Sequence, residues 1–355
     1  MGYAQRTGRK SDHKIQIGVS SFCRNEKKNA NSGSSEMGKK MGPISVILLC
    51  FNRAKQLGPT LRSIREQNYP DLEIVVAEDD DDGLTEDIAE QYGAKYIRHV
   101  RTESYPAFQS IAVVRNLGVK ASSGDILVMH DGETYHEGNV IERLVETVRA
   151  QDCLAVAQAK MPEGHYVTGI VGARPQALKR STFEAMGGFE EQFFGYGCED
   201  SFFVWLLNRR GVPVVQIDAK AVHQSHEATG GGFEEYTGFS NVALAWALTY
   251  EIEMGERPPV ANYGPLKLDG VQPTYGQGDM FPLFDRRNSA STANDEQERL
   301  TLEIEWARGW AGKCEEKSKT EENPQWIARL LKCRDKHLAL AGAAGRMVAR
   351  RTVKG

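Results

Sequence analysis

The sequence predicts an α/β protein with a mostly parallel sheet flanked by helices, followed by a helical C-terminal extension. The segment Ile44–Cys50 is a continuous apolar run of strand length, which is typical of a strand buried on both faces. Similar short runs then alternate with segments whose apolar residues recur at helical spacing, as in consecutive βαβ units. From about Glu296 to Arg351, helical spacing is the only periodic signal.

The individual elements follow from local signals. Asn52, directly after the first strand, is predicted to cap a helix that ends near Pro70. Further strands are expected at 73–77, 96–99, 126–129, 154–159, 169–173 and 214–217, and further helices at 111–121, 140–148, 300–307 and 326–340.

Changes in composition divide the chain into four parts. Residues 1–42 are rich in Ser, Gly, Asn, Lys and Arg, which predicts a flexible basic N-terminal arm. Residues 43–228 contain the alternating strands and helices of the expected α/β domain. Residues 229–290 contain clustered Gly and Pro, including Gly230–Gly232, and are expected to form a loop-rich lid or wrap. Residues 291–355 are the expected helical region.

Composition and charge exclude several classes of protein. The chain has 355 residues and a formal net charge of −4, which argues against nucleic acid as a partner. Its six cysteines include no C-x-x-C pair, so we expect reduced thiols rather than a zinc ribbon or a disulfide framework. No apolar run approaches the roughly 18 to 20 residues of a membrane span, and no secretory signal is recognisable. The expected location is cytoplasmic, with peripheral membrane attachment as an alternative.

Acidic residues follow two of the expected strands. Glu78–Asp82 is a run of five carboxylates, and at least some of them must face solvent, a metal or a donor-rich ligand. An EF-hand loop is excluded because the twelfth position from Glu78 is Ala89, where a glutamate is required. A simple acidic turn remains an alternative. Asp131 and Glu133, one residue apart after another strand, can bind a hard divalent cation.

A third cluster lies in the segment Gly187–Asp200, which is rich in Gly and Phe and ends in two acids. Glycines allow the backbone to approach a ligand closely, and aromatic rings provide flat surfaces for sugar rings. Helix capping by the two acids is the structural alternative. After a further strand, His223 and His226 offer two imidazole groups as metal ligands.

Taken in order, these segments resemble the family 2 glycosyltransferases, which have the GT-A (Rossmann-like) fold. Val46–Arg53 looks like the family's first strand and nucleotide-binding loop, and Glu73–Asp79 looks like its second strand with an acidic pair. Val114–Gly118 is similar to the family's A-R-N-x-G motif, and Gly124–Thr134 to the stretch that ends in its D-x-D metal motif. The segment Gly188–Asp200 resembles the C-terminal part of galactosyltransferases.

The resemblance implies roles for individual residues. Asp131 and Glu133 would bind Mn²⁺ or Mg²⁺ together with His223, with His226 as the alternative histidine. Asp200, beside Glu199, would be the catalytic base that accepts the proton of the acceptor hydroxyl. The nucleotide-sugar donor would contact Phe51, Arg53, Asp79, Arg115 and Asp131, and the acceptor would contact Tyr196 and Phe194.

The resemblance also divides residues 43–228 into a nucleotide-sugar and metal half, 43–135, and an acceptor and catalytic-base half, 136–228. The sequence departs from the family in three places, one of which is that Ala77–Glu78 and the extra acids Asp80–Asp82 replace the usual D-D-G-S beside the nucleotide. Glu133 replaces the second aspartate of D-x-D but keeps its oxygen donors, and Tyr196 stands where galactosyltransferases have tryptophan.

The expected function is metal-dependent transfer of a sugar from a nucleotide-diphosphate sugar, expected to be a UDP-sugar, to a hydroxyl group, with inversion at the anomeric carbon. The acceptor could be a glycan, a lipid-linked molecule or a protein. One alternative is a catalytically inactive relative that binds carbohydrate. The other is a sugar nucleotidyltransferase, for which a Gly-rich phosphate loop is expected in place of Cys50–Arg53.

Overall fold

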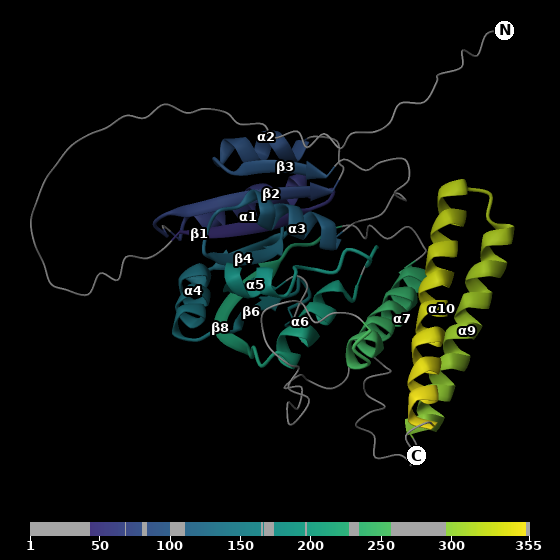
Figure 1. The fold of residues 1–355 in the computed structure, drawn as a ribbon. Helices are drawn as coiled ribbons and strands as arrows, with labels where there is room; N and C mark the ends of the chain where they lie inside the picture. Colours follow the sequence, from purple (N-terminus) through teal and green to yellow (C-terminus); the bar gives the residue numbers. More distant parts are fainter. Residues whose placement is uncertain are drawn as a thin grey trace, which may run out of the picture. The chain divides into compact units, whose positions relative to one another are not determined.

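The computed structural model describes residues 43–67, 69–79, 84–99, 111–164, 166, 174–195, 197–226, 234–256 and 296–352 (Figure 1). All of these described residues belong to one compact unit. The expected N-terminal arm, the expected strand at 169–173, the acids Asp80–Asp82, Tyr196 and Gly230–Gly232 lie outside the described residues.

The described strands form one eight-stranded sheet of order β3-β2-β1-β4-β7-β6-β8-β5. The four strands β3, β2, β1 and β4 are mutually parallel, whereas β7 runs antiparallel to both of its neighbours. β8 is parallel to β6 and antiparallel to β5. The strands are β1 (Ile44–Cys50), β2 (Leu72–Asp79), β3 (Lys95–His99), β4 (Ile126–Asp131), β5 (Thr134–Glu137), β6 (Leu154–Lys160), β7 (Gln176–Lys179) and β8 (Val214–His223).

Helices cover both faces of this sheet, which explains why the first strand is apolar throughout. Ile44, Val46 and Leu48 of β1 belong to one buried cluster, with residues of α1, α2 and α4, whereas Ile47 belongs to a second, with residues of α3, α5 and α6. The side chains of a strand alternate between faces, so both faces of β1 must be apolar. These helices are α1 (Ala54–Arg65), α2 (Leu84–Gln91), α3 (Ile111–Ala121), α4 (Val140–Ala150), α5 (Arg180–Ala185) and α6 (Glu199–Arg209).

The predicted fold class is confirmed, with local differences. Asn52 does not cap the first helix: its backbone adopts φ 53°, and α1 begins at Ala54 without a side-chain cap. β8 continues to His223 rather than ending near residue 217, because it pairs with both β6 and β5.

Residues 234–253 were expected to belong to a loop-rich lid, but they form helix α7 (Glu234–Glu253). Leu244 and Leu248 of α7 pack into the sheet-side cluster that contains α6, while Trp246 and Tyr250 pack into a third cluster with the C-terminal helices. A helix that is buried on two sides lacks the one-sided apolar stripe by which helices are predicted.

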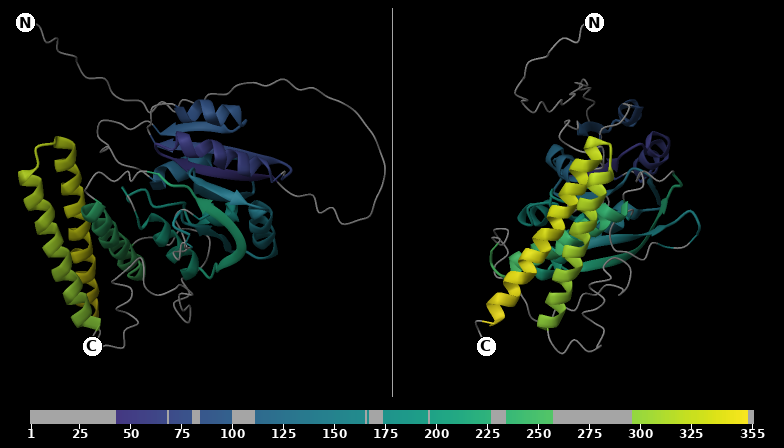
Figure 2. Two further views of the ribbon diagram at one scale, coloured as in Figure 1. Left: turned by 180° about the vertical axis from the view of Figure 1, so that it is seen from behind. Right: turned by 90° about the vertical axis from the view of Figure 1, so that its right-hand side faces the viewer.

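The C-terminal region is helical, as expected. Its two long helices, α9 (Glu296–Thr320) and α10 (Pro324–Thr352), contact each other extensively, and α10 also packs on α7 (Figure 2). At this junction His337 is fully buried, its ring stacked on Trp310 at 6.0 Å between centroids and edge-on to Trp306 at 5.3 Å. None of the helices in the described ranges combines the length and the hydropathy required to cross a bilayer.

The packing of α3 on the sheet yields a first prediction. A Cβ atom at Gly118 would lie 2.4 Å from Cγ2 of Ile47 and 3.3 Å from Cβ of Ala77, so Gly118→Ala should lower the free energy of unfolding by about 1 to 3 kcal/mol. Gly309, in α9, meets nothing within 4 Å, so Gly309→Ala should instead raise it by up to about 1 kcal/mol. Urea unfolding of both variants checks this, and equal signs for the two would contradict the packing of α3.

The buried histidine yields a second prediction. Burial, and to a smaller extent Lys336, lowers the pKa of His337 to about 4. Between that value and the unfolded pKa of about 6.5, the unfolded chain binds the extra proton, so this contribution to stability falls as the pH falls through that window. His337→Leu should reduce the loss of unfolding free energy between pH 7 and pH 5 by roughly 2 kcal/mol in total, with a local slope of at most about 1.4 kcal/mol per pH unit, measured by urea unfolding. Identical slopes for the two proteins would contradict this burial.

Candidate functional site

The candidate site is built where several strands end together. In the register of the sheet, Cys50 lies opposite Glu78 and Leu49 lies opposite Asp131, so β1, β2 and β4 finish at one edge. The carboxyl ends of parallel strands are where α/β proteins bind ligands. The sequence pattern alone therefore brings the predicted acidic residues to the same edge.

Gly132 makes the turn between the two predicted metal-binding acids possible. Its N–H donates a 2.7 Å hydrogen bond to the carbonyl oxygen of Leu49, and a Cβ atom at this position would lie 2.4 Å from Sγ of Cys50. Only glycine allows the turn to approach β1 this closely. The residue between Asp131 and Glu133 therefore contributes by its small size.

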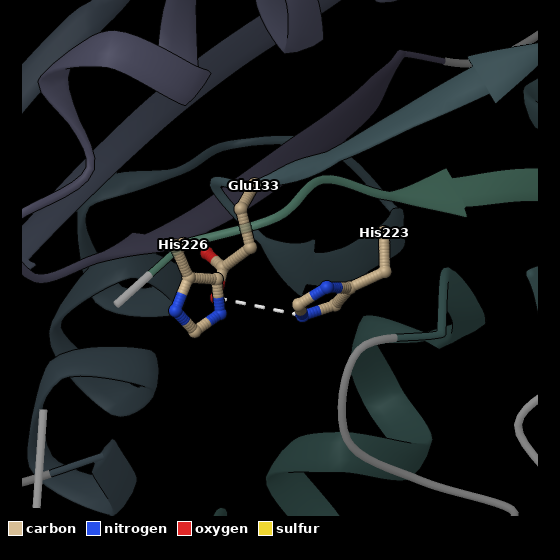
Figure 3. A group of neighbouring side chains, drawn as sticks. All are labelled: Glu133, His223 and His226. Carbon is tan, nitrogen blue, oxygen red and sulfur yellow. Dashed lines mark ion pairs between the residues drawn. The ribbon is translucent and has the colours of Figure 1, made fainter. Parts of the chain in front are cut away.

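Glu133, His223 and His226 form a compact group of possible metal ligands. The pairing of β5 with β8 places Thr134 opposite His223, and the N–H of Gln224 donates to the carbonyl oxygen of Glu133 at 2.9 Å. Oε1 of Glu133 lies 3.7 Å from Nε2 of His223 and 3.4 Å from Nε2 of His226. One ligand atom from each residue lies within 4.8 Å of the others, and the three side chains point toward one another (Figure 3).

The chemistry of this group fits a divalent transition metal. Burial and the neighbouring His226 lower the pKa of His223, which favours the neutral imidazole, the form that binds metals. A carboxylate with two imidazoles suits Mn²⁺ better than Mg²⁺, which prefers oxygen ligands alone. The residues present therefore fit a bound cation.

Arg53 borders the same group. Its Nε atom lies 3.1 Å from Oε1 of Glu133, and its Nη2 atom lies 3.5 Å from Nε2 of His226. Arg53 is 5% exposed, so little water screens the charge of its guanidinium group. A buried cation beside a metal-binding group is suited to holding the phosphates of a nucleotide.

Arg115 connects Asp131 with the second acidic pair. From α3, its Nη2 atom donates to Oδ1 of Asp131 at 3.2 Å, and its Nη1 atom donates to Oε1 of Glu199 at 3.0 Å. Asp131 ends β4 and Glu199 begins α6, so one side chain joins three elements. Asp131 therefore forms an ion pair with Arg115. Glu133 and His223 also lie close enough to influence the pKa of Asp131.

Burial controls the charges around Arg115. Desolvation raises the pKa of Asp131 to about 6, with the Glu133 charge adding to the rise and Arg115 opposing it. Desolvation and the adjacent Asp200 raise the pKa of Glu199 to about 8 despite the contact with Arg115. The two carboxyl groups together raise the pKa of Arg115, which stays cationic. Asp131 and Glu199 can therefore exchange protons near neutral pH.

Asp200 lies at the start of α6 in a fixed conformation. Its Oδ1 atom accepts hydrogen bonds from the backbone N–H of Ser201 at 2.6 Å and from the Ser201 hydroxyl at 3.1 Å. Among the described residues, no hydrogen bond is donated to Oδ2 of Asp200. The residue is 6% exposed, so a carboxylate with one anchored oxygen and one available oxygen faces a largely dry environment.

The structure places the other predicted residues less directly. Asp79 ends β2 as expected, and its Oδ1 atom lies 2.9 Å from Nδ1 of His99 on the neighbouring strand. Phe51 follows β1 and is partly exposed. The ring of Phe194 faces α10, with Nζ of Lys336 3.7 Å from its centroid and Cζ of Arg329 5.6 Å from it.

Sequence reasoning missed several supporting residues. Gln224, between the two histidines, donates through its amide to the carbonyl oxygens of Gln56 and Glu133 and to the hydroxyl of Thr60, and so ties the group to α1. The anchoring of Asp200 by Ser201 was also missed. No residue pattern distinguishes such glutamines and serines from ordinary polar ones, so only their position in the fold reveals them.

Residues 45–197 match the model of the family described as Glycosyl transferase family 2. The chain is 25% identical over 113 residues to the putative glycosyltransferase EpsH of Bacillus subtilis, covering 32% of each chain. It is 29% identical over 125 residues to a dolichol-phosphate mannosyltransferase of Pyrococcus furiosus, covering 34% of each. These matches therefore span about a third of the length of the curated relatives.

Among solved structures, the chain is similar to the mannosyltransferase PcManGT of Pyrobaculum calidifontis, whose structure is a complex with GDP-Man and Mn²⁺. The identity is 15% and the TM-score 0.42, over 86% of this chain and 87% of that one.

The double ion pair of Arg115 yields a third prediction, which needs no assay of activity. Arg115→Met leaves two buried carboxyl groups, Asp131 and Glu199, without their hydrogen-bond donor, and at pH 7 both then favour the protonated form, so the free energy of unfolding should fall by roughly 2 to 4 kcal/mol. Adding Glu199→Gln to that variant replaces one of these carboxyl groups by a neutral amide and should restore part of the loss.

The matched control is Arg209→Met, which breaks the half-exposed pair of Arg209 with Glu253 and should cost about 1 kcal/mol. Urea unfolding at pH 7 compares the three variants. A loss for Arg115→Met no larger than that for Arg209→Met would contradict the role assigned to Arg115.

Proposed function

Residues 45–197 form a glycosyltransferase family 2 domain of GT-A fold, and on this premise we propose that the protein transfers a sugar from a nucleotide-diphosphate sugar to an acceptor hydroxyl group. One observation supports this proposal above all. Glu133 and two histidines form a group able to bind a metal, and Asp131, two residues before Glu133, is joined to Glu199 of the acidic pair Glu199–Asp200 by the buried side chain of Arg115. Glycosyl transfer requires such a pair of functions, one for the leaving diphosphate and one for the attacking hydroxyl.

Glu133, His223 and His226 would hold the cation, for which we propose Mn²⁺. When bound, such a cation neutralises the charge that develops on the diphosphate leaving group. The carboxyl group of Asp131 lies near this site. Arg115 donates a hydrogen bond to it at 3.2 Å and so offsets part of its negative charge. In this proposal Asp131 contributes its charge to the site, and the three other residues supply the metal ligands.

The donor nucleotide, for which UDP is our first candidate, would lie along the ends of β1, β2 and β4. Arg53, whose Nε atom is 3.1 Å from Glu133, is placed to interact with the phosphates, and Phe51 and Asp79 lie at the strand ends where the base would be held. His99 orients the carboxylate of Asp79 through the 2.9 Å contact.

Asp200 would accept the proton of the acceptor hydroxyl as that oxygen attacks the anomeric carbon. Ser201 holds Oδ1 of Asp200, which presents Oδ2 in a fixed direction. Glu199 accepts a hydrogen bond from Arg115, and its proposed role is to position Asp200. A general base of this kind is worth typically 10²- to 10⁴-fold in rate, and a single displacement inverts the anomeric configuration.

A fourth prediction tests the donor site. The protein is incubated with a panel of UDP- and GDP-sugars and Mn²⁺, and release of the nucleoside diphosphate is measured without an acceptor. One donor should be hydrolysed slowly, and Glu133→Gln should lower that rate at least about 100-fold by removing a charged ligand. Glu137→Gln, the same chemical change at an exposed site on β5, should leave the rate unchanged.

Asp200→Asn separates proton acceptance at the acceptor hydroxyl from binding of the donor. It should keep metal-dependent donor binding, measured by calorimetry, and lose transfer once an acceptor is found, because only the proton acceptor is removed. Failure of every nucleotide sugar to bind, with or without Mn²⁺, would contradict the proposal. Binding without any turnover would identify a carbohydrate-binding relative, and release of pyrophosphate from a nucleoside triphosphate and a sugar phosphate would identify a nucleotidyltransferase.

A further inference from the structure

The residues that hold Asp200 in place extend into the C-terminal helices. We propose that Asn241 of α7 and Lys336 of α10 are positioning residues for the catalytic base: Asn241 donates hydrogen bonds to Phe194 and Gly197, in the segment that precedes α6, and Lys336 holds Asn241. The assignment of Asp200 as the base rests on the proposed function, whereas the effect on the segment does not. Neither residue lies in the part of the chain that matches the family model, 45–197.

Asn241 binds the segment at two points. Its side-chain amide donates a hydrogen bond to the carbonyl oxygen of Phe194 and another to that of Gly197, both at 2.9 Å. The residue is fully buried. One amide group therefore sets the distance between these two carbonyl oxygens, the second of which immediately precedes Cys198.

Lys336 in turn fixes the amide of Asn241. Its Nζ atom donates to Oδ1 of Asn241 at 2.6 Å, which orients the amide with its N–H groups toward the segment. The same Nζ atom lies 3.7 Å from the centroid of the Phe194 ring. Burial lowers the pKa of Lys336 to about 7, so a neutral replacement removes a hydrogen-bond donor rather than a permanent charge.

The segment needs such external support because its own backbone is unfavourable. Gly195, Gly197 and Cys198 have φ angles of 73°, 96° and 78°. For Cys198, which has a Cβ atom, this left-handed conformation costs free energy that other contacts must offset. Helix α6 follows directly with Glu199 and Asp200, so a change in the turn would move both acids.

Two variants separate the links of this chain of contacts. Asn241→Asp keeps an oxygen for Lys336 but removes the N–H groups that bind the carbonyl oxygens of the segment. Lys336→Met keeps the apolar stem but removes the donor to Asn241. The control is Tyr250→Phe, at a position nine residues after Asn241 in α7. This change deletes the buried hydrogen bond from Tyr250 to Glu303 of α9.

Hydrogen–deuterium exchange of the amides in residues 189–201, measured on the full chain, tests the positioning directly. Exchange should become about tenfold faster in Asn241→Asp and in Lys336→Met, and stay at the wild-type rate in Tyr250→Phe. Wild-type exchange in both variants would overturn the proposal. So would equal acceleration in Tyr250→Phe, because the effect would then be a general loosening of the helices.

Activity provides a second measurement. Asn241→Asp should lower kcat for transfer by roughly 10- to 100-fold while the Kd of the donor stays within about twofold, since a misplaced base slows the reaction without changing the donor site. A weakened donor Kd with unchanged kcat would overturn the positioning of the base. If the wild-type protein transfers no sugar at all, the proposed function fails, whereas the exchange measurement still decides whether these residues hold the segment.

Discussion

The arrangement of the site depends on one buried guanidinium group. Arg115 comes from α3, yet its two arms hold Asp131 at the end of β4 and Glu199 at the start of α6. Removing a charge from water is costly, so a buried arginine is tolerated only where carboxylates offset that cost. Each carboxylate likewise depends on the arginine, since burial raises the pKa of both above their usual range. This mutual dependence fixes α6, and with it Asp200, relative to the sheet edge where a nucleotide would bind.

Backbone register provides the second constraint. Glu133 and His223 are 90 positions apart in the chain, but the pairing of Thr134 with His223 makes them neighbours, and the glycine before Glu133 lets the turn lie against Cys50. A shift of one residue in β8 would turn His223 to the opposite face of the sheet. The possible metal ligands are therefore brought together by main-chain hydrogen bonds, and they can be preorganised before any cation binds.

Much of this fold could be predicted from the sequence, because buried parallel strands leave an unmistakable apolar run, as in Ile44–Cys50. The acids that end β2 and β4, Asp79 and Asp131, could be placed at one edge because the carboxyl ends of parallel strands meet there. Helix α7 could not be predicted, since it is buried on two sides and has no polar face to set a period. The pairing of Arg115 with Glu199 was equally hidden, because 84 residues separate them and only the packing of α6 brings them together. Phe194 looked like a free aromatic surface, but its ring packs beside Lys336, a neighbour that no local pattern could supply.

The boundary of the family match has a physical meaning. The matched residues end at 197, immediately before Glu199 and Asp200, and both histidines of the metal-binding group follow later still. The matched part therefore contains the strand edge and Arg115, whereas the groups that would complete the chemistry belong to α6 and β8. The turn that joins the two parts is left-handed at Cys198 and is bound from outside by Asn241. Helices α7 and α10 therefore support the junction between the strand edge and α6, because Asn241 and Lys336 hold the residues that precede the two acids.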